Sequence, residues 1–153
     1  MIDDLYSARI LTLVANMPRS GRLAAPQASA EKVAKLCGSK ITVDVVVEDG
    51  KVVDYAQDVS ACALGQAAAA VLGQNVIGAD LSEIELARDS LFAMLKSNGS
   101  PPAGRFAELA VLEPVKDYPA RHASTLLAFE ATVEAVRKAT GASETRTSTA
   151  GAA

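Results

Sequence analysis

The sequence has few aromatic residues and few of the side chains that most often carry chemistry. Only 4% of its 153 residues are aromatic and none is Trp, while half are hydrophobic and many of those are alanine. We therefore expect an aliphatic core in which helices pack close together. With two Cys and one His in the whole chain, few positions can supply a nucleophile or a soft metal ligand.

Charge and hydropathy exclude two classes of partner. The net charge is −3, and no run of Lys and Arg exceeds two residues, so the basic surface used in nucleic-acid binding is missing. No apolar stretch approaches the roughly 20 residues that a membrane-spanning helix needs. The acidic opening MIDDLYSARI (1–10) is unlike the basic start of a secretory signal, so we expect a cytoplasmic protein.

The length is typical of a single domain. We expect that domain to cover residues 1–139, and we expect a disordered tail at 140–153, where no apolar periodicity is found. The chain has no Ser-His-Asp arrangement, no P-loop and no dinucleotide fingerprint. These absences argue against an independent enzyme.

The first third of the chain predicts a helix followed by a loop. Residues 3–16 have apolar side chains at helical spacing and two acidic residues in the first turn, and Pro18 ends the helix. Residues 18–36 mix Pro, Ser, Gly and Ala, which is typical of a loop lying on the surface, with a short helix possible at 30–36.

The clearest strand signal lies in the middle of the chain. Over residues 41–48, apolar side chains alternate with Thr42, Asp44 and Glu48, which is the period of a half-buried strand. Asp49-Gly50 is a strong hairpin turn, and a second run rich in β-branched residues follows at 51–59. We predict an antiparallel pair with one face covered by the rest of the chain.

The remainder predicts helices. Ser60 is placed to cap one of them, and Ser82 with Glu85 has the spacing of a capping box for the next. The predicted helices are 62–72, 82–96 and 120–139.

The two cysteines are the candidate functional residues. Cys37 precedes a glycine just before the first predicted strand, and Cys62 stands at the start of a helix. Free amides at a helix N-terminus favour a thiolate, which can ligate a metal or attack a sulfur atom. The alternative is that each cysteine is a small buried apolar residue, with Cys62 closing the core behind the sheet.

Three blocks of sequence resemble the iron–sulfur cluster assembly family of IscU, SufU and the NifU N-terminal domain. They are LYSARILTLVANMPRSGRL (5–23), CGSKITVDVVVEDGKVVDYAQDVSACALGQAAAAVL (37–72) and LAVLEPVKDYPARHASTLLAF (109–129), in the family's order and with matching separations. The additional residues around 80–106 are similar to the SufU branch.

The resemblance implies both a fold and a function. The fold would be α+β, with a small antiparallel sheet of about three strands, including 39–48 and 51–59, and helices packed on one face. The function would be iron–sulfur cluster assembly, as a scaffold or as an acceptor of sulfur from a cysteine desulfurase. Family members hold zinc or a nascent cluster with three cysteines and an aspartate.

Carried onto this chain, the family's ligand set is half retained. Its first two cysteines fall on Cys37 and Cys62, but its aspartate falls on Ser39 and its third cysteine on Ser124. Serine is a poor metal ligand, so we expect binding of zinc or of an iron–sulfur cluster to be weak or absent. Cys62 is then the candidate sulfur acceptor, and all four side chains should face one another near one end of the sheet.

Two alternatives follow from the missing ligands. His122, two residues before Ser124, could complete a site with the two cysteines, or it could be an exposed histidine in the first turn of its helix. The whole protein could also be a metal-free family member that docks on a desulfurase or another assembly factor and regulates it.

Overall fold

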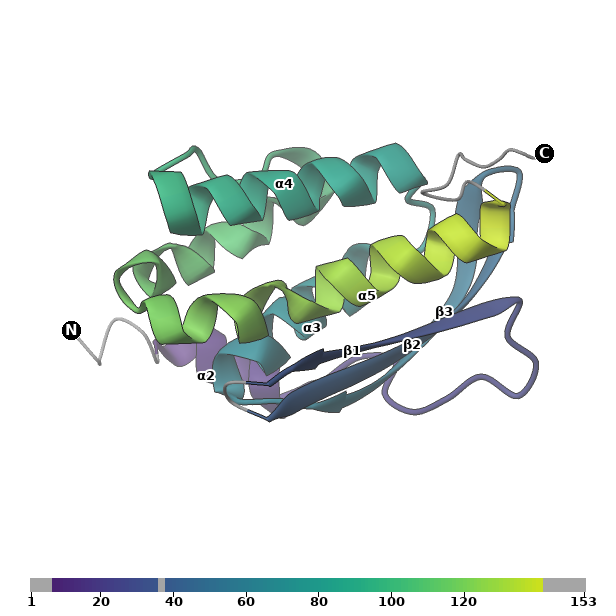
Figure 1. Cartoon of the computed structure of the whole chain (residues 1–153), viewed down its shortest axis with the longest axis horizontal. Coiled ribbons are helices and arrows are strands. Elements are labelled where there is room, and N and C mark those ends of the chain that lie inside the picture. Colours follow the sequence, from purple (N-terminus) through teal and green to yellow (C-terminus); the bar gives the residue numbers. More distant parts are fainter. Residues whose placement is uncertain (1–6, 36–37, 142–153) are drawn as a thin grey trace.

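A three-stranded antiparallel sheet forms one side of the molecule, and helices cover one of its faces (Figure 1). This is a computed structural model, and it describes residues 7–35 and 38–141. Helices α5 and α3 pack next to the sheet, and α4 forms the outer layer. The elements are α2 (Ala8–Ala15), β1 (Ala28–Ala34), β2 (Ser39–Glu48), β3 (Lys51–Ser60), α3 (Ala63–Asn75), α4 (Leu81–Ser97), the 3-10 segments η1 (Gly104–Asp117) and η2 (Pro119–Arg121), and α5 (His122–Thr140). The fold class predicted from the sequence is confirmed.

The hairpin of β2 and β3 forms as the sequence predicts. Asp49 and Gly50 both adopt positive φ, +54° and +78°, which is what the tightest hairpin turns require at their two central residues. Ile41, Val43 and Val45 of β2 are fully buried on the face that the helices cover. Alternation along this strand therefore fixes which face meets the core.

The third strand, β1, corrects the prediction of a loop with a short helix at 30–36. Residues 28–34 pair with β2 along the sheet edge, from Ala28 opposite Val45 to Ala34 opposite Ser39. Ala30 and Ala34 are buried, and α5 packs on this strand. Ladder hydrogen bonds and the burial of small alternate side chains outweigh the helix propensity of Ala, Glu and Lys.

Helix α3 occupies the centre of the molecule. Ala67, Ala68, Ala69 and Ala70 are all fully buried, because α3 packs against α2, α5, η1 and the sheet. Side chains of one methyl group let these elements approach closely, as the composition predicts.

Polar side chains inside the core join the sheet to the helices. Gln57 of β3 is fully buried, and its amide nitrogen donates to the carbonyls of Pro18 and Ala69, at 3.2 and 3.0 Å. The buried Tyr55 hydroxyl lies 2.9 Å from the Thr132 hydroxyl of α5. Burial raises the pKa of Tyr55 far above its usual value, with only partial opposition from this hydrogen bond.

Asp44 corrects the expectation that the polar positions of β2 face solvent. It is fully buried, because the chain before β1 folds over the outer face of the sheet. The Arg22 guanidinium donates to both carboxylate oxygens, at 2.7 and 3.0 Å, and the Leu23 amide and the Ser29 hydroxyl donate as well. Burial alone would raise the pKa of Asp44, but these hydrogen bonds outweigh it and lower the pKa.

Three helix starts also differ from the prediction. Ser60 is the last residue of β3 rather than a cap, and Cys62 takes the N-cap position of α3. The capping box of α4 is formed by Asp80 and Glu83 rather than by Ser82 and Glu85; a start at Leu81 packs that side chain on the core. Helix α2 begins at Ala8, capped by Ser7, and the first residues of the predicted helix 3–16 lie outside the described residues. Of the tail predicted at 140–153, residues 142–153 also lie outside them, whereas Thr140 is the last residue of α5 and is helical rather than disordered. None of the helices within 7–35 and 38–141 has the length and apolar character to cross a bilayer.

Candidate functional site

The site lies at the end of the sheet where β2 begins and β3 ends. Ser39 is the first residue of β2, and its neighbour Lys40 pairs with Ser60, the last residue of β3. The chain then turns at Ala61 and places Cys62 at the start of α3. Antiparallel pairing therefore brings two positions far apart in the sequence to one end of the sheet.

Helix α5 supplies the third side chain. Ser124 lies in the first turn of α5, and its Oγ is 3.3 Å from Cys62 Sγ and 3.1 Å from Ser39 Oγ. The structure thus brings together three of the four positions at which the family resemblance places ligands. They come from β2, from the start of α3 and from the start of α5, so the arrangement depends on the packing of all three.

Exposure differs among these three side chains. Ser39 is 3% exposed and Ser124 is completely buried, whereas Cys62 is only half-buried. Above them lies a surface hollow of about 180 Å³, lined by Gly38, Ser39, Ser60, Ala61 and Cys62. This is smaller than the roughly 300–1,000 Å³ of a site for an organic ligand, but it has room for a small inorganic group. The sulfur is the accessible reactive atom, and the hydroxyls lie behind it.

The start of α3 favours an anion at this point. Cys62 is the N-cap, and its side chain accepts no capping hydrogen bond from the helix. The first amides of a helix lack intrahelical partners, and together with the helix dipole they attract negative charge. A sulfur anion in the hollow would lie next to these amides.

Gly65 sets the distance between the starts of α3 and α5. A Cβ at this position would lie 2.7 Å from Ser124 Oγ and 3.0 Å from the Ser124 carbonyl oxygen. Those separations are too short for a real contact, so only glycine lets α3 and α5 approach this closely. The signal in the sequence is a glycine in an alanine-rich helix, three residues after the cysteine.

His122 lies away from this cluster. It is 3% exposed, which corrects the expectation of an exposed histidine, because η1 packs over the start of α5. Its Nε2 lies 2.9 Å from the Val115 carbonyl oxygen, and its Nδ1 has no hydrogen-bond partner among the residues that the structure describes. Residues two apart on a helix do not share a face, so His122 is directed toward η1 while Ser124 meets Cys62.

Cys37 lies outside the described residues, so its predicted closeness to Cys62 stays a prediction. Within the described part of the chain, no group of three His, Cys, Asp or Glu side chains gathers that could hold a metal ion. Cys62 is a free thiol, accompanied by two hydroxyls. This donor set does not fit a structural zinc site, which takes four sulfur or nitrogen ligands.

Comparison with known proteins identifies relatives of this chain along almost its whole length. The chain is 51% identical to a nitrogen-fixing NifU-like protein (N-terminal) from Brucella abortus, over 93% of this chain and 99% of that one, with a TM-score of 0.90. It is 28% identical to the iron–sulfur cluster assembly scaffold protein IscU of Thermotoga maritima, over 88% of this chain and 94% of that protein.

A more distant structure shows the same fold. It is a putative iron–sulfur cluster assembly scaffold protein for the SUF system from Fervidobacterium islandicum, 21% identical over 88% of this chain and 98% of that one, with a TM-score of 0.80. The NifU-like N-terminal domain family matches residues 5–125. The family expected from the three sequence blocks is therefore confirmed: this chain belongs to the NifU-like N-terminal domain family.

Proposed function

We propose that this chain is an iron–sulfur cluster assembly protein that receives sulfur on Cys62 and holds it, or a nascent cluster, at the end of the sheet. The cluster is cargo that is built and passed on. The sulfur donor in this proposal is a cysteine desulfurase. Because free thiols persist in the reducing cytoplasm, the proposal places the protein there.

One observation carries the proposal. Ser124 Oγ lies 3.3 Å from Cys62 Sγ and 3.1 Å from Ser39 Oγ, so three remote segments meet at the positions where the family resemblance places ligands. A cysteine that only filled space in the core would not need a surface hollow above its sulfur. Membership of the family and the scaffold names of two relatives agree with this assignment.

The donor set indicates how the cargo is held. A cluster is normally bound by four protein ligands, most often thiolates, and the whole chain has two cysteines. Serine hydroxyls are hard to deprotonate and bind iron weakly compared with thiolates. A cluster here would therefore be weakly held and readily released, and sulfur acceptance by Cys62 needs no metal ligand at all.

The sulfur-transfer step needs only the exposed thiolate. The Cys62 thiolate attacks the outer sulfur of a persulfide on the donor enzyme, and a new sulfur–sulfur bond forms at Cys62. The old sulfur–sulfur bond breaks, and the donor cysteine leaves as a thiolate, so no other oxidant or reductant is consumed. The amides at the start of α3 and the Ser124 hydroxyl would stabilise the resulting persulfide anion.

The test is sulfur transfer followed by mass spectrometry. The chain is incubated anaerobically with a cysteine desulfurase, its pyridoxal cofactor and L-cysteine, and the intact mass is measured. We expect the added mass of one sulfur atom on Cys62, located by peptide mapping, and no such addition there in Cys62→Ala. A Ser60→Ala variant is the matched control, because it changes the lining of the same hollow without touching the sulfur.

Cluster binding is measured separately. Ferrous iron and sulfide are added anaerobically, and iron content and the visible absorption of the cluster are recorded before and after a chelator. We expect iron that a chelator removes within minutes in the wild type and none retained in Cys62→Ala. Absence of both sulfur transfer to Cys62 and iron binding would contradict the proposed function.

A further inference from the structure

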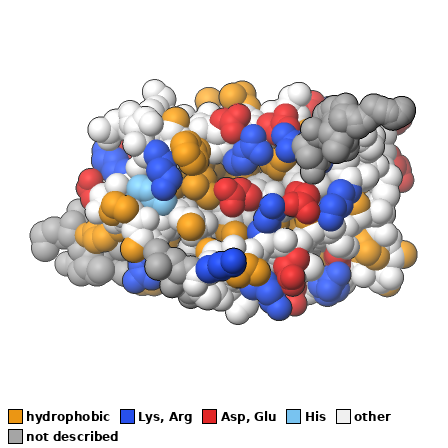
Figure 2. Space-filling model, in the orientation of Figure 1, with side chains coloured by type: hydrophobic (Ala, Val, Ile, Leu, Met, Phe, Trp, Pro, Cys, Tyr) orange, Lys and Arg blue, Asp and Glu red, His pale blue; other side chains and the backbone are white. Residues whose placement is uncertain are grey.

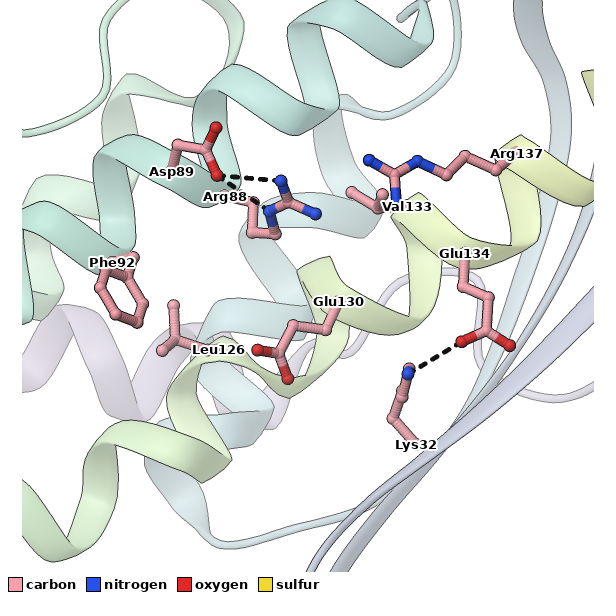
Figure 3. Close-up of a pocket in the computed structure, with 9 residues that line it drawn as sticks. All are labelled: Lys32, Arg88, Asp89, Phe92, Leu126, Glu130, Val133, Glu134 and Arg137. Carbon is pink, nitrogen blue, oxygen red and sulfur yellow. Dashed lines mark hydrogen bonds and ion pairs between the residues drawn. The ribbon is translucent and has the colours of Figure 1, made fainter. Parts of the chain in front are cut away.

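A second, larger hollow lies between α4 and α5, away from the cysteine site. It has a volume of about 540 Å³ and is bordered by α4, by α5 and by Lys32 of the edge strand β1 (Figure 3). Figure 2 shows acidic and basic side chains interleaved over this face of the molecule. The hollow is therefore a charged groove with an accessible opening.

The cations that line the groove already have acidic partners. Lys32 Nζ lies 2.8 Å from Glu134, and Arg88 lies 3.0 Å from Asp89. Arg137 is paired with Glu85 of α4, at 2.5 Å. An anion entering the groove would have to compete with these pairs.

Glu130 is the exception among the acidic side chains of the groove. It lies on α5 between Leu126 and Glu134, and within the part of the chain that the structure describes it makes no ion pair or side-chain hydrogen bond. Burial raises its pKa, against the opposing effects of Lys32, Arg88 and Lys96. The groove thus contains one partly buried carboxylate that three nearby cations influence but that forms no ion pair or side-chain hydrogen bond with any described residue.

An apolar surface continues from this carboxylate. Figure 3 shows the Phe92 ring, the Leu126 side chain and the Glu130 carboxylate following one another along the groove. Phe92 is 50% exposed, which is unusual for so large an apolar side chain, and the Lys96 ammonium lies 5.8 Å from its ring centre. The ring can therefore receive a cation on its face.

We propose that this groove binds an arginine side chain of a partner protein, with the guanidinium on Glu130 and the methylene stem against Phe92 and Leu126. A guanidinium presents two parallel donors to a carboxylate and also packs flat on an aromatic ring. Its three methylenes cover apolar surface while its head reaches the charge. Lysine also has a methylene stem and a charge, but only arginine presents two parallel donors to a carboxylate.

A protein fits the groove better than a free cation. The hollow of about 540 Å³ offers apolar surface at Phe92 and Leu126 beside the Glu130 carboxylate, and a free cation would leave that apolar surface uncovered. The inference does not depend on the cysteine site, since the groove shares no residue with it.

The probe is the peptide acetyl-Leu-Arg-Leu-amide, titrated into ¹⁵N-labelled full-length chain and followed by NMR. The matched probe replaces arginine by citrulline, which has the same shape and no charge, and a third carries glutamate instead. We expect saturable shifts at the amides of Phe92, Leu126 and Glu130 with the arginine peptide. Binding should be at least tenfold weaker with the citrulline peptide and absent with the glutamate peptide.

Variants of the chain complete the test. Glu130→Gln should weaken binding of the arginine peptide at least tenfold, and Phe92→Ala should weaken it severalfold. Glu48→Gln, at the exposed end of the hairpin, and Cys62→Ala should leave it unchanged. Equal binding of the citrulline peptide, an unaltered affinity in a folded Glu130→Gln variant, or no saturable shifts in the groove would each overturn the proposal.

Discussion

Restoring the missing ligands at Ser124 and Ser39 tests the site most directly. In Ser124→Cys combined with Ser39→Asp, the two new side chains and Cys62 supply three ligands from the described residues, and the family resemblance assigns the fourth to Cys37. Two sulfurs on one zinc ion lie about 3.7–4.0 Å apart, given bonds of roughly 2.3 Å in tetrahedral geometry. Ser124 Oγ is now 3.3 Å from Cys62 Sγ, so the two positions are within about 1 Å of that range and a small side-chain rotation reaches it.

The expected magnitude follows from mass action. At about 1,000 times the dissociation constant, zinc should raise the free energy of unfolding by about 4 kcal/mol, because it binds the folded chain selectively. For a chain of this length, about 1 kcal/mol shifts the melting temperature by roughly 2–4 °C, so the rise should be about 8–16 °C. The measurement is thermal unfolding by circular dichroism, each variant compared with itself with and without zinc.

The controls separate ligation from general stabilisation. Wild type should show little or no zinc-dependent rise, and neither should Ser39→Asp alone or the double variant with Cys62→Ala added. Self-comparison matters, since a thiol at the fully buried position 124 and an aspartate at position 39 both destabilise the zinc-free form. A folded double variant with no zinc-dependent rise would refute the reasoning that the three side chains still converge as a ligand pocket.

Three further predictions concern the surroundings of the two sites. Gly65→Ala places a methyl group against Ser124 Oγ. Despite the gain in helix propensity, we expect the free energy of unfolding, measured in urea, to fall by about 1–2 kcal/mol. Adding Ser124→Ala removes that oxygen and should recover part of the loss. Asp44 has a lowered pKa, so its ionised form stabilises the fold above about pH 4, and that contribution is lost as the pH falls further. Asp44→Asn should therefore unfold at a lower urea concentration at pH 7, and its stability should depend less on acid than that of wild type. Equal urea midpoints at pH 7 would contradict this. Glu130 has a raised pKa, so its charge lowers the stability of the fold as the pH rises above the usual glutamate pKa. Glu130→Gln should therefore have a higher melting temperature than wild type at pH 7, and the same melting temperature at pH 4. A lower melting temperature at pH 7 would show that the carboxylate has a stabilising partner.

The sequence predicts those parts of the fold whose signals are local. Alternation over 41–48 and the Asp49-Gly50 turn are sufficient for the hairpin, because both the buried face and the turn geometry are encoded within the segment. Strand β1 is encoded elsewhere: its residues favour a helix, and it becomes a strand by pairing with β2 and burying alternate alanines under α5. The choice between two overlapping capping boxes likewise depends on whether Leu81 reaches the core.

The site likewise has features that the sequence predicts and features that depend on tertiary packing. Cys62, Ser39 and Ser124 could be selected because family blocks fix their positions, and the structure places both Cys62 Sγ and Ser39 Oγ within hydrogen-bond distance of Ser124 Oγ. The burial of His122 could not be predicted, since it depends on η1, whose apolar side chains recur every three residues rather than at the spacing of an α-helix. The groove at Glu130 combines one side chain of β1 with parts of α4 and α5, and nothing in the spacing of those residues along the chain brings them together.

The distances between the side chains of the cysteine site depend on the buried alanines of α3, which lie away from it. At about 1.5 Å per residue, Ala67–Ala70 lie roughly 7–12 Å along the helix from Cys62, well outside the hollow. Yet they are fully buried where α3 packs against α5, which carries Ser124, and against β3, which pairs with the strand that carries Ser39. A single added methyl group there must displace α5 or the sheet, and with it one hydroxyl relative to the sulfur. The distances between the reacting groups can therefore change while every residue that lines the site stays the same.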